Sequence, residues 1–176
     1  DGELEEAFAP QSVTLTLEDE IDSSRGDMLV RPGNQPKVDN RFDATVVWMS
    51  EQPLLPGKQY LFKQTTKVTT GAVSTLRYRI DVNTLHRQDA PSLALNEIGR
   101  CSITLTEPIM HDAYRRNRAT GAFIMIDRLS NATVGAGMII DREPEEGRSG
   151  AHWDDAVPEA VHGTASAVTA AERRAP

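Results

Sequence analysis

The chain has 176 residues, and a hydrophobic content of 39% suits one ordinary folded domain with attachments rather than a protein disordered throughout. No apolar run approaches the ~20 residues that a membrane helix needs, and the acidic start Asp1-Gly2-Glu3-Leu4-Glu5-Glu6 is unlike a signal peptide, so we expect a cytoplasmic protein without membrane contact. The net charge of −7 divides into −6 over residues 1–38, +3 over 39–142 and −4 over 143–176, and a middle block of +3 is too weakly basic to predict nucleic-acid binding.

Short β-branched runs with rough alternation recur up to about residue 140, and no convincing helical period appears among them. The strands predicted from these runs are Ser12–Leu17, Met28–Val30, Phe42–Met49, Gln59–Gln64, Lys67–Ser74, Leu76–Val82, Glu97–Leu105, Ala122–Asp127 and Thr133–Ile140. Many short strands separated by turn residues predict an all-β protein, either a barrel or a sandwich.

Two proline-containing connections suggest how the chain divides into domains. Arg31-Pro32-Gly33-Asn34-Gln35-Pro36-Lys37 predicts a stiff linker, whereas Gln52-Pro53-Leu54-Leu55-Pro56-Gly57-Lys58 predicts a loop that ends in a turn at Pro56-Gly57. We therefore expect residues 1–38 to be the end of one barrel plus a linker and residues 39–142 to be a second barrel. The first unit has too few strands to bury its own face, so we expect the chain to begin within a domain.

Residues 143–176 differ in composition from the rest of the chain. They are acidic, rich in Ala and poor in large apolar residues, which predicts a largely disordered linker tail. Thr169-Ala170-Ala171-Glu172 fits a capping box, but Pro176 follows within a few residues. We expect the chain to end where another domain would begin.

A nucleotide site is not predicted. A P-loop needs glycines whose amides hold phosphates and a Lys followed by Ser or Thr, and the Gly57-Lys58 pair has Gln52 in place of the leading Gly and Gln59 after the Lys. Gly135-Ala136-Gly137 begins like a dinucleotide fingerprint, but it lies inside an apolar run, which favours a bulge or a close approach of strands.

Several isolated motifs have ordinary structural interpretations. Arg25-Gly26-Asp27 predicts a turn that leads into the strand at Met28–Val30, and Cys101 alternates with apolar residues like a buried, reduced thiol. A metal site is not predicted, because the four histidines are far apart in the sequence: His86, His111, His152 and His162.

The most catalytic-looking cluster is His111-Asp112 with the nearby Arg115, Arg116 and Arg118. An Asp can orient a His base and arginines can hold an anion, so a small hydrolase is one hypothesis. No nucleophile lies nearby in the sequence, and a solvated or partner-facing basic loop is the favoured interpretation.

Arg77 and Arg79 alternate with Leu76, Tyr78 and Ile80, which places the two arginines on one face of a strand and the apolar residues on the other. We expect Arg77 and Arg79, together with Arg115, Arg116 and Arg118, to form the surface that binds a partner. An ordinary solvated strand face explains Arg77 and Arg79 about as well.

Longer runs resemble a known family, the large GTPase subunit of bacterial sulfate adenylyltransferase, including forms fused to adenylylsulfate kinase. The resemblance covers about residues 1–141, and the segment from Asp127-Arg128-Leu129-Ser130-Asn131 to Gly137 is typical of this subunit within the elongation-factor superfamily. The runs that carry it are Ser12 to Asp22 with Arg25-Gly26-Asp27, Phe42-Asp43-Ala44 with Val47-Trp48-Met49, Pro56 to Tyr60, Asp112 to Gly121, Phe123 to Asn131 and Thr133 to Ile139.

The resemblance implies a fold and an assembly. The fold is a six-stranded Greek-key barrel like domain 3 of elongation factor Tu, preceded by part of a second barrel. The assembly is a heterodimeric enzyme that makes adenosine 5′-phosphosulfate and pyrophosphate from ATP and sulfate, coupled to GTP hydrolysis. Its small subunit carries the adenylyl transfer, and GTP, ATP and Mg²⁺ are implied only for that subunit and for a GTPase domain outside this sequence.

On this interpretation the chain is a non-catalytic barrel without catalytic, cofactor or metal residues of its own. Its implied partners are the small subunit, the GTPase domain of the same protein and, in fused forms, an adenylylsulfate kinase domain. The alternative is a detached translation-factor-like barrel that binds RNA or a regulatory protein, since a fold does not fix a function.

Overall fold

Regular structure begins at Lys37 in the computed structural model, which describes residues 4–8 and 10–140. One short helix, α1 (Arg118–Gly121), lies among the strands. The strands are β1 (Lys37–Trp48), β2 (Gln59–Gln64), β3 (Lys67–Ile80), β4 (Arg87–Gln88), β5 (Ile98–His111), β6 (Ala122–Ile126) and β7 (Thr133–Ile140).

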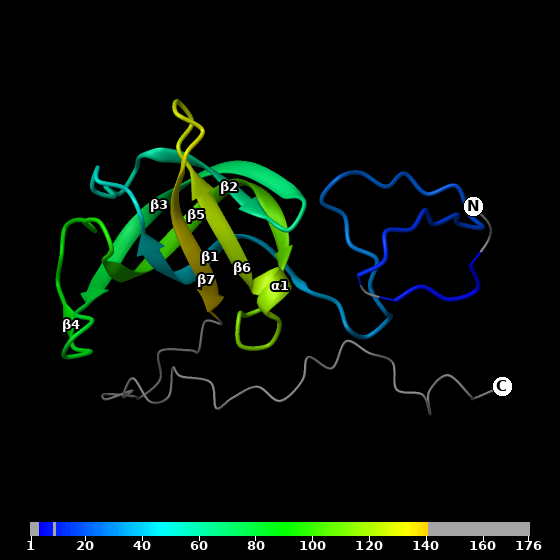
Figure 1. Cartoon of the computed structure of the whole chain (residues 1–176), viewed down its shortest axis with the longest axis horizontal. Coiled ribbons are helices and arrows are strands. Elements are labelled where there is room, and N and C mark those ends of the chain that lie inside the picture. Colours follow the sequence, from blue (N-terminus) through cyan, green and yellow to red (C-terminus); the bar gives the residue numbers. More distant parts are fainter. Residues whose placement is uncertain (1–3, 9, 141–176) are drawn as a thin grey trace.

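The strands form a closed antiparallel barrel. Their order in the sheet is β2-β6-β7-β1-β5-β3-β4, and a further pairing between β2 and β3 closes six of them into a ring, with β4 left at the edge of β3 (Figure 1). Strand β1 lies between β5 and β7 rather than beside β2, which is the non-sequential order of a Greek-key barrel. The predicted all-β, six-stranded barrel is confirmed.

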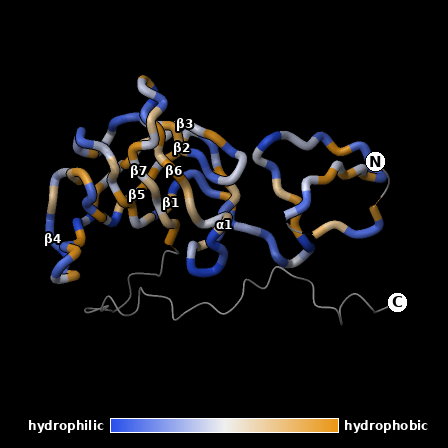
Figure 2. The backbone as a smooth tube through the Cα atoms, in the orientation of Figure 1, coloured by the Kyte–Doolittle hydropathy of each residue, from blue (hydrophilic) through white to orange (hydrophobic). Residues whose placement is uncertain are grey.

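Strand alternation builds the core of the barrel. Along β1, Phe42, Ala44, Val46 and Trp48 are buried, and the tube in Figure 2 shows the apolar residues concentrated in the barrel strands. Aromatic rings from several strands meet inside it, with the Phe42 and Phe123 ring centroids 5.8 Å apart. The interior is filled with side chains and holds the barrel together.

The glycines of β7 allow that packing. A Cβ on Gly137 would lie 2.1 Å from the ring of Phe123, and one on Gly135 would lie 3.1 Å from the ring of Trp48. The Gly135-Ala136-Gly137 run is therefore a close approach of strand and ring, as the sequence predicts, and not a dinucleotide turn.

Several element boundaries differ from the prediction. The expected strands Lys67–Ser74 and Leu76–Val82 are one strand, β3, which passes through a bulge between Val73 and Thr75 instead of ending there. Two elements were not predicted: the two-residue β4 and the four-residue α1, whose first turn is capped by the Asn117 side chain accepting from the Ala119 amide at 3.1 Å.

The strands predicted at Ser12–Leu17 and Met28–Val30 are not formed. A strand needs a neighbour to pair with, and no other described segment runs alongside either of them in the sheet. The turn at Arg25-Gly26-Asp27 is confirmed, because Gly26 has a φ of +107° and the Asp27 amide donates to the Ser24 carbonyl at 3.1 Å. The assignment of residues 1–38 to a preceding barrel stays a prediction.

Some sequence predictions lie outside the described residues. These are the disordered tail over residues 143–176, its capping box from Thr169, and the histidines His152 and His162. Within residues 4–8 and 10–140, no helix has the length and hydrophobicity to cross a bilayer.

Candidate partner-binding surface

Arg77 and Arg79 lie on the outer face of β3, as their spacing predicts. Leu76, the residue before them, packs against the core instead. The two arginines project over the neighbouring strand β5, where the register pairs Arg79 with Gly99.

Arg77 belongs to a charged network centred on Asp43 of β1. The Asp43 side chain is only 6% exposed, and its Oδ2 lies 3.5 Å from a guanidinium nitrogen of both Arg77 and Arg100. Ser102 joins them, since its Oγ donates to Asp43 at 2.8 Å and accepts from Arg77 Nε at 3.0 Å. This network links β1, β5 and β3 across the outside of the barrel.

Arg79 anchors a different part of the molecule. Its guanidinium forms an ion pair with Glu97 and donates to the Gln88 side-chain oxygen at 2.5 Å. Gln88 donates in turn to Asp81 at 3.3 Å, and Asp81 caps the turn that follows β3. Arg79 therefore fixes the excursion between β3 and β5 that carries β4.

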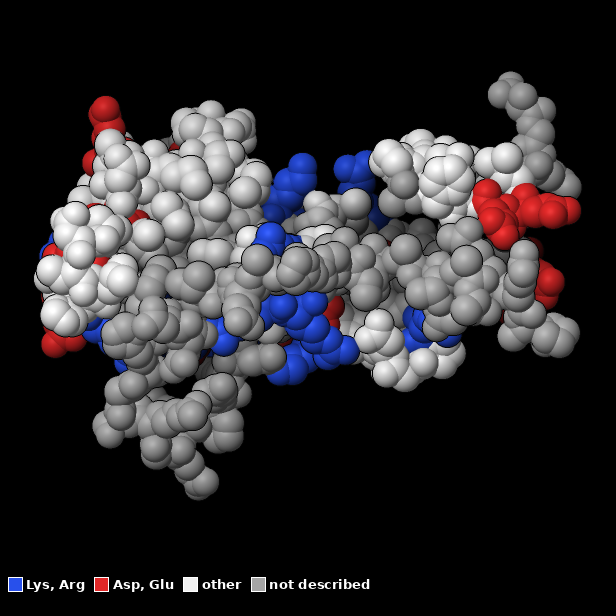
Figure 3. Space-filling view, turned by 60° about the horizontal axis from the view of Figure 1, so that its bottom comes forward, with Lys and Arg blue, Asp and Glu red and all other residues white. Residues whose placement is uncertain are grey.

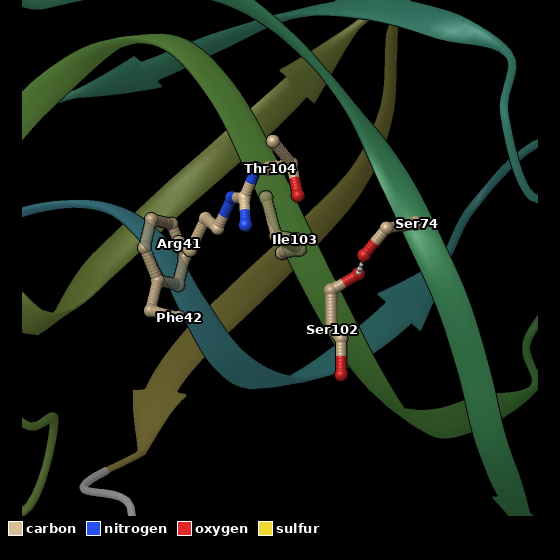
Figure 4. A pocket seen from close by; sticks show the side chains of 6 residues that line it. All are labelled: Arg41, Phe42, Ser74, Ser102, Ile103 and Thr104. Carbon is tan, nitrogen blue, oxygen red and sulfur yellow. Dashed lines mark hydrogen bonds between the residues drawn. The ribbon is translucent and has the colours of Figure 1, made fainter.

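A shallow hollow of about 380 Å³ opens beside the Asp43 network, lined by Arg41, Ser74, Ser102 and Thr104 among others (Figure 4). Bulges shape it on both sides, between Asp39 and Arg41 in β1 and at Ser74 in β3. Both serine protons have acceptors: Ser74 Oγ donates to the Ser102 carbonyl at 2.9 Å, and Ser102 Oγ donates to Asp43. These hydrogen bonds link the strands, and the Asp43 carboxylate beside Ser102 is itself ion-paired with Arg77 and Arg100.

The arginines after β5 are exposed, and the side chain of Arg116 is 63% exposed, against 39% for Arg77 and 35% for Arg79. Arg116 donates to the Asn34 side chain at 3.0 Å and lies 3.8 Å from the Asp112 carboxylate. Arg118 lies 6.0 Å over the Tyr114 ring. Basic side chains gather between the barrel and the N-terminal segment in Figure 3, and the Asn34 contact shows that the segment lies against this loop.

The structure therefore separates the five predicted arginines into two groups. Arg79 of β3 lies opposite the start of β5, where it pairs with Gly99, and Arg115 lies beyond the end of β5, a strand of 14 residues that extends about 45 Å. The two β3 arginines form ion pairs with Asp43 of β1 and with Glu97, whereas the loop arginines lie near α1 and the N-terminal segment. Their role in binding a partner stays a prediction.

Asp43 and Arg100 were not predicted as part of this surface. Their signal in the sequence is a polar residue at an outward position between buried neighbours, as Asp43 is between Phe42 and Ala44. Alternation identifies the outward face but not which charges meet across strands, because that depends on the register.

His111 and Asp112 do not form a catalytic pair. His111 is 4% exposed, its ring lies 5.3 Å from that of Phe42, and neither ring nitrogen has a hydrogen-bond partner. Burial lowers the pKa of His111, opposed in part by the Asp112 backbone and the Asp39 charge. The Asp112 carboxylate instead accepts from Thr120 at 2.8 Å.

The remaining chemical candidates have structural roles. Cys101 is fully buried, and desolvation raises its pKa to about 12, so it is a packed thiol and not a nucleophile. Lys58 follows a turn at Gly57, which has a φ of +88°, and pairs with Asp127 at 3.2 Å rather than facing a phosphate cradle. Among residues 4–8 and 10–140, no group of three or more metal-ligating side chains is present.

Comparisons with known proteins agree with this geometry. Residues 41–140 match the family described as GTP-eEF1A C-terminal domain-like. The chain is 58% identical over 160 residues to the bifunctional enzyme CysN/CysC of Rhodopirellula baltica, covering 89% of this chain and 24% of that protein. It is 58% identical over 141 residues to sulfate adenylyltransferase subunit 1 of Alteromonas mediterranea, covering 80% of this chain and 30% of that protein.

Among solved structures, the fold is similar to that of sup35 complexed with GDP. The TM-score is 0.56 at 17% identity, covering 62% of this chain and 27% of that one. This likeness shows the fold. The chain spans between about a quarter and a third of the length of the curated relatives it matches.

Proposed function

The chain belongs to the GTP-eEF1A C-terminal domain-like family, and we propose that it is a non-catalytic β-barrel portion of sulfate adenylyltransferase subunit 1 that acts in sulfate assimilation. The observation that carries the proposal is 58% identity to a named subunit 1 over 80% of the chain. In this proposal the barrel holds the parts of the enzyme together and couples them, while the reaction occurs elsewhere.

The barrel is suited to such a role. A closed sheet has no free edge along its length, and its core of interlocking rings resists deformation, so surfaces on opposite sides keep a fixed relation. The Asp43 network further ties β1, β5 and β3 on the outside. A rigid body of this kind can transmit a shift from one partner to another.

The described residues do not fit the phosphate groups of GTP. The one Gly-Lys pair forms a turn with its Lys held by Asp127, and Gln59 follows where a P-loop has Ser or Thr. The proposal therefore assigns GTP, ATP and Mg²⁺ to a GTPase domain and to the small subunit.

The proposed partner is the small subunit that carries adenylyl transfer. The name subunit 1 among the relatives supports a subunit partner, and the CysN/CysC relative supports a kinase fusion in some proteins. As part of the same proposal, the chain acts in the cytoplasm.

An assay of the purified chain tests whether it is catalytic. We expect neither GTP hydrolysis nor formation of adenosine 5′-phosphosulfate from ATP and sulfate above a no-protein control. Turnover that persists through repeated purification would contradict the proposal.

The alternative, an RNA-binding barrel, has less support. The barrel is only weakly basic, and two of its arginines, Arg77 and Arg79, are already ion-paired with Asp43 and Glu97, which leaves them less available to phosphates. A salt-dependent gel shift with tRNA would favour it over the assembly role.

A further inference from the structure

The hollow beside the Asp43 network contains two polar groups that the barrel itself does not use. Arg41 of β1 and Thr104 of β5 are partners in the strand register, and both line the hollow. The Arg41 side chain reaches toward Thr104 in Figure 4. Within residues 4–8 and 10–140, neither the Arg41 guanidinium nor the Thr104 hydroxyl forms a hydrogen bond or an ion pair. Both donors are therefore available to a ligand.

The other residues of the hollow carry no negative charge. Ser74 Oγ donates to the Ser102 carbonyl and Ser102 Oγ donates to Asp43, so both serine protons are engaged in the barrel. Phe42 and Ile103 complete the lining and are buried. Since no carboxylate lines the hollow, an anion inside it would meet donors without a repelling charge.

The face of the barrel around the hollow is positively charged. Arg77 and Arg100 share the Asp43 carboxylate, and Arg77 Nε donates to Ser102 at the edge of the hollow. With Arg41 they make three positive charges against one negative, a local charge of +2. The Asp43 side chain is 6% exposed, against 39% for Arg77 and 21% for Arg100, so the positive charges face the solvent. Such a surface attracts a doubly charged anion.

The nearest other carboxylate on β1 does not cancel this charge. Asp39 lies before the bulge in β1 and lines a neighbouring hollow together with Lys37, whose positive charge balances it there. No ion pair joins Asp39 to Arg41 in the part of the chain that the structure describes. Arg41 therefore keeps its charge for the hollow beside Asp43.

A tetrahedral oxyanion matches these donors better than other kinds of ligand. A guanidinium offers several N–H groups in one plane, and a hydroxyl on the facing strand offers one more from a different direction. The oxygens of a tetrahedral ion point in several directions, so they can accept from both strands at once. A cation is disfavoured by the local charge of +2, and a large apolar ligand finds no exposed wall, because Phe42 and Ile103 are buried.

We propose that the hollow between β1, β5 and β3 binds a tetrahedral dianion, inorganic sulfate or hydrogen phosphate, which accepts hydrogen bonds from Arg41 and Thr104. Arg77 and Arg100 supply the surplus positive charge, and the bulges in β1 and β3 shape the hollow. The site belongs to the barrel alone, so the inference does not depend on the proposed function.

An NMR titration of the full chain tests the proposal, with sodium sulfate and sodium phosphate as separate probes at constant ionic strength. We expect saturable shifts of the Arg41 Nε–Hε signal and of the backbone amides of Ser74 and Thr104. Sodium acetate, whose anion carries a single charge, should bind at least about tenfold more weakly. The dianion that binds more tightly identifies the ligand.

Variants assign the binding to the two free donors. Arg41→Gln should weaken binding of the dianion at least about tenfold, because it removes charge-assisted hydrogen bonds. Thr104→Val should weaken it about threefold, since a neutral hydroxyl contributes less. Arg128→Gln, at an exposed arginine of the hairpin between β6 and β7, is the matched control and should bind like the wild-type chain. Because Arg41 is exposed, its variant should keep the wild-type midpoint of thermal unfolding.

Two results would overturn the inference. The first is shifts that rise linearly with every salt, and the second is an Arg41→Gln variant that binds the dianion as tightly as the wild-type chain. Acetate that binds as tightly as sulfate would contradict the assignment to a dianion. None of these results bears on the assembly role, which is tested by binding of the small subunit.

Discussion

Asp43 shows how one residue can organise the outside of the barrel. Its carboxylate forms ion pairs with Arg77 of β3 and Arg100 of β5 and accepts a hydrogen bond from Ser102 of β5. On the opposite face of β1, the residues on either side of Asp43 are part of the core. Alternation in the sequence predicts that Arg77 points outward. That it meets Asp43 could not be predicted, because the two residues are distant in the chain and meet only through the register of β1 with β5 and of β5 with β3.

We predict that Asp43→Ala lowers the free energy of unfolding by about 1–3 kcal/mol. The change leaves two arginines and a serine without their shared acceptor, and the arginines are exposed enough to turn toward water, which limits the loss. Urea denaturation of both proteins measures the difference. Asp89→Ala, at an exposed carboxylate, is the control and should be neutral; equal effects at the two sites would contradict the role of the network.

We predict an acid-side loss of stability that depends on His111. Burial lowers its pKa in the folded protein below the ordinary 6.5, so the unfolded chain binds a proton more readily. This contribution is fully present above about pH 6.5 and is lost as the pH falls below it.

His111→Phe should remove that dependence, because Phe packs against Phe42 without a proton to take up. Denaturation at pH 7.5 and pH 5.5 should show a smaller difference for the variant than for the wild-type chain. Equal differences in the two proteins would mean that the His111 pKa is not lowered.

At the scale of elements, the barrel strands are the most predictable part of the chain. Strands β2 and β7 have the predicted bounds, because alternation and flanking turn residues agree there. The division of β3 was wrong, since a bulge disturbs alternation without ending the strand. Polar and apolar residues alternate in Ser12–Leu17 as regularly as in the barrel strands, yet no strand forms there. Alternation indicates only a preference for the extended conformation, whereas a strand also needs a neighbouring strand to pair with.

The contact between β7 and the Phe123 ring predicts a test at this scale. Gly137→Ala should cost about 1–3 kcal/mol of unfolding free energy, because a Cβ would overlap the buried ring, which is hemmed in by Phe42 and Phe62. In a Phe123→Leu background the same substitution should cost less, as denaturation can show. An equal cost in both backgrounds would place the strain elsewhere.

At the scale of the whole molecule, the barrel carries different features at its two ends. The loop arginines lie at the α1 end beside the N-terminal segment, and the β6–β7 hairpin with the exposed Leu129 lies at the other end of β6. The sequence predicts the barrel and the arginines. It does not reveal that Leu129 is exposed, because an isolated leucine in a turn carries no signal of its exposure.

The proposed function requires that the barrel acts through assembly with the small subunit. The most direct measurement is the molar mass, by light scattering during size-exclusion chromatography, of the chain mixed with an equal amount of the small subunit. We predict one peak whose molar mass is the sum of the masses of the chain and the small subunit. Two peaks with the separate masses, at concentrations of tens of micromolar, would contradict it.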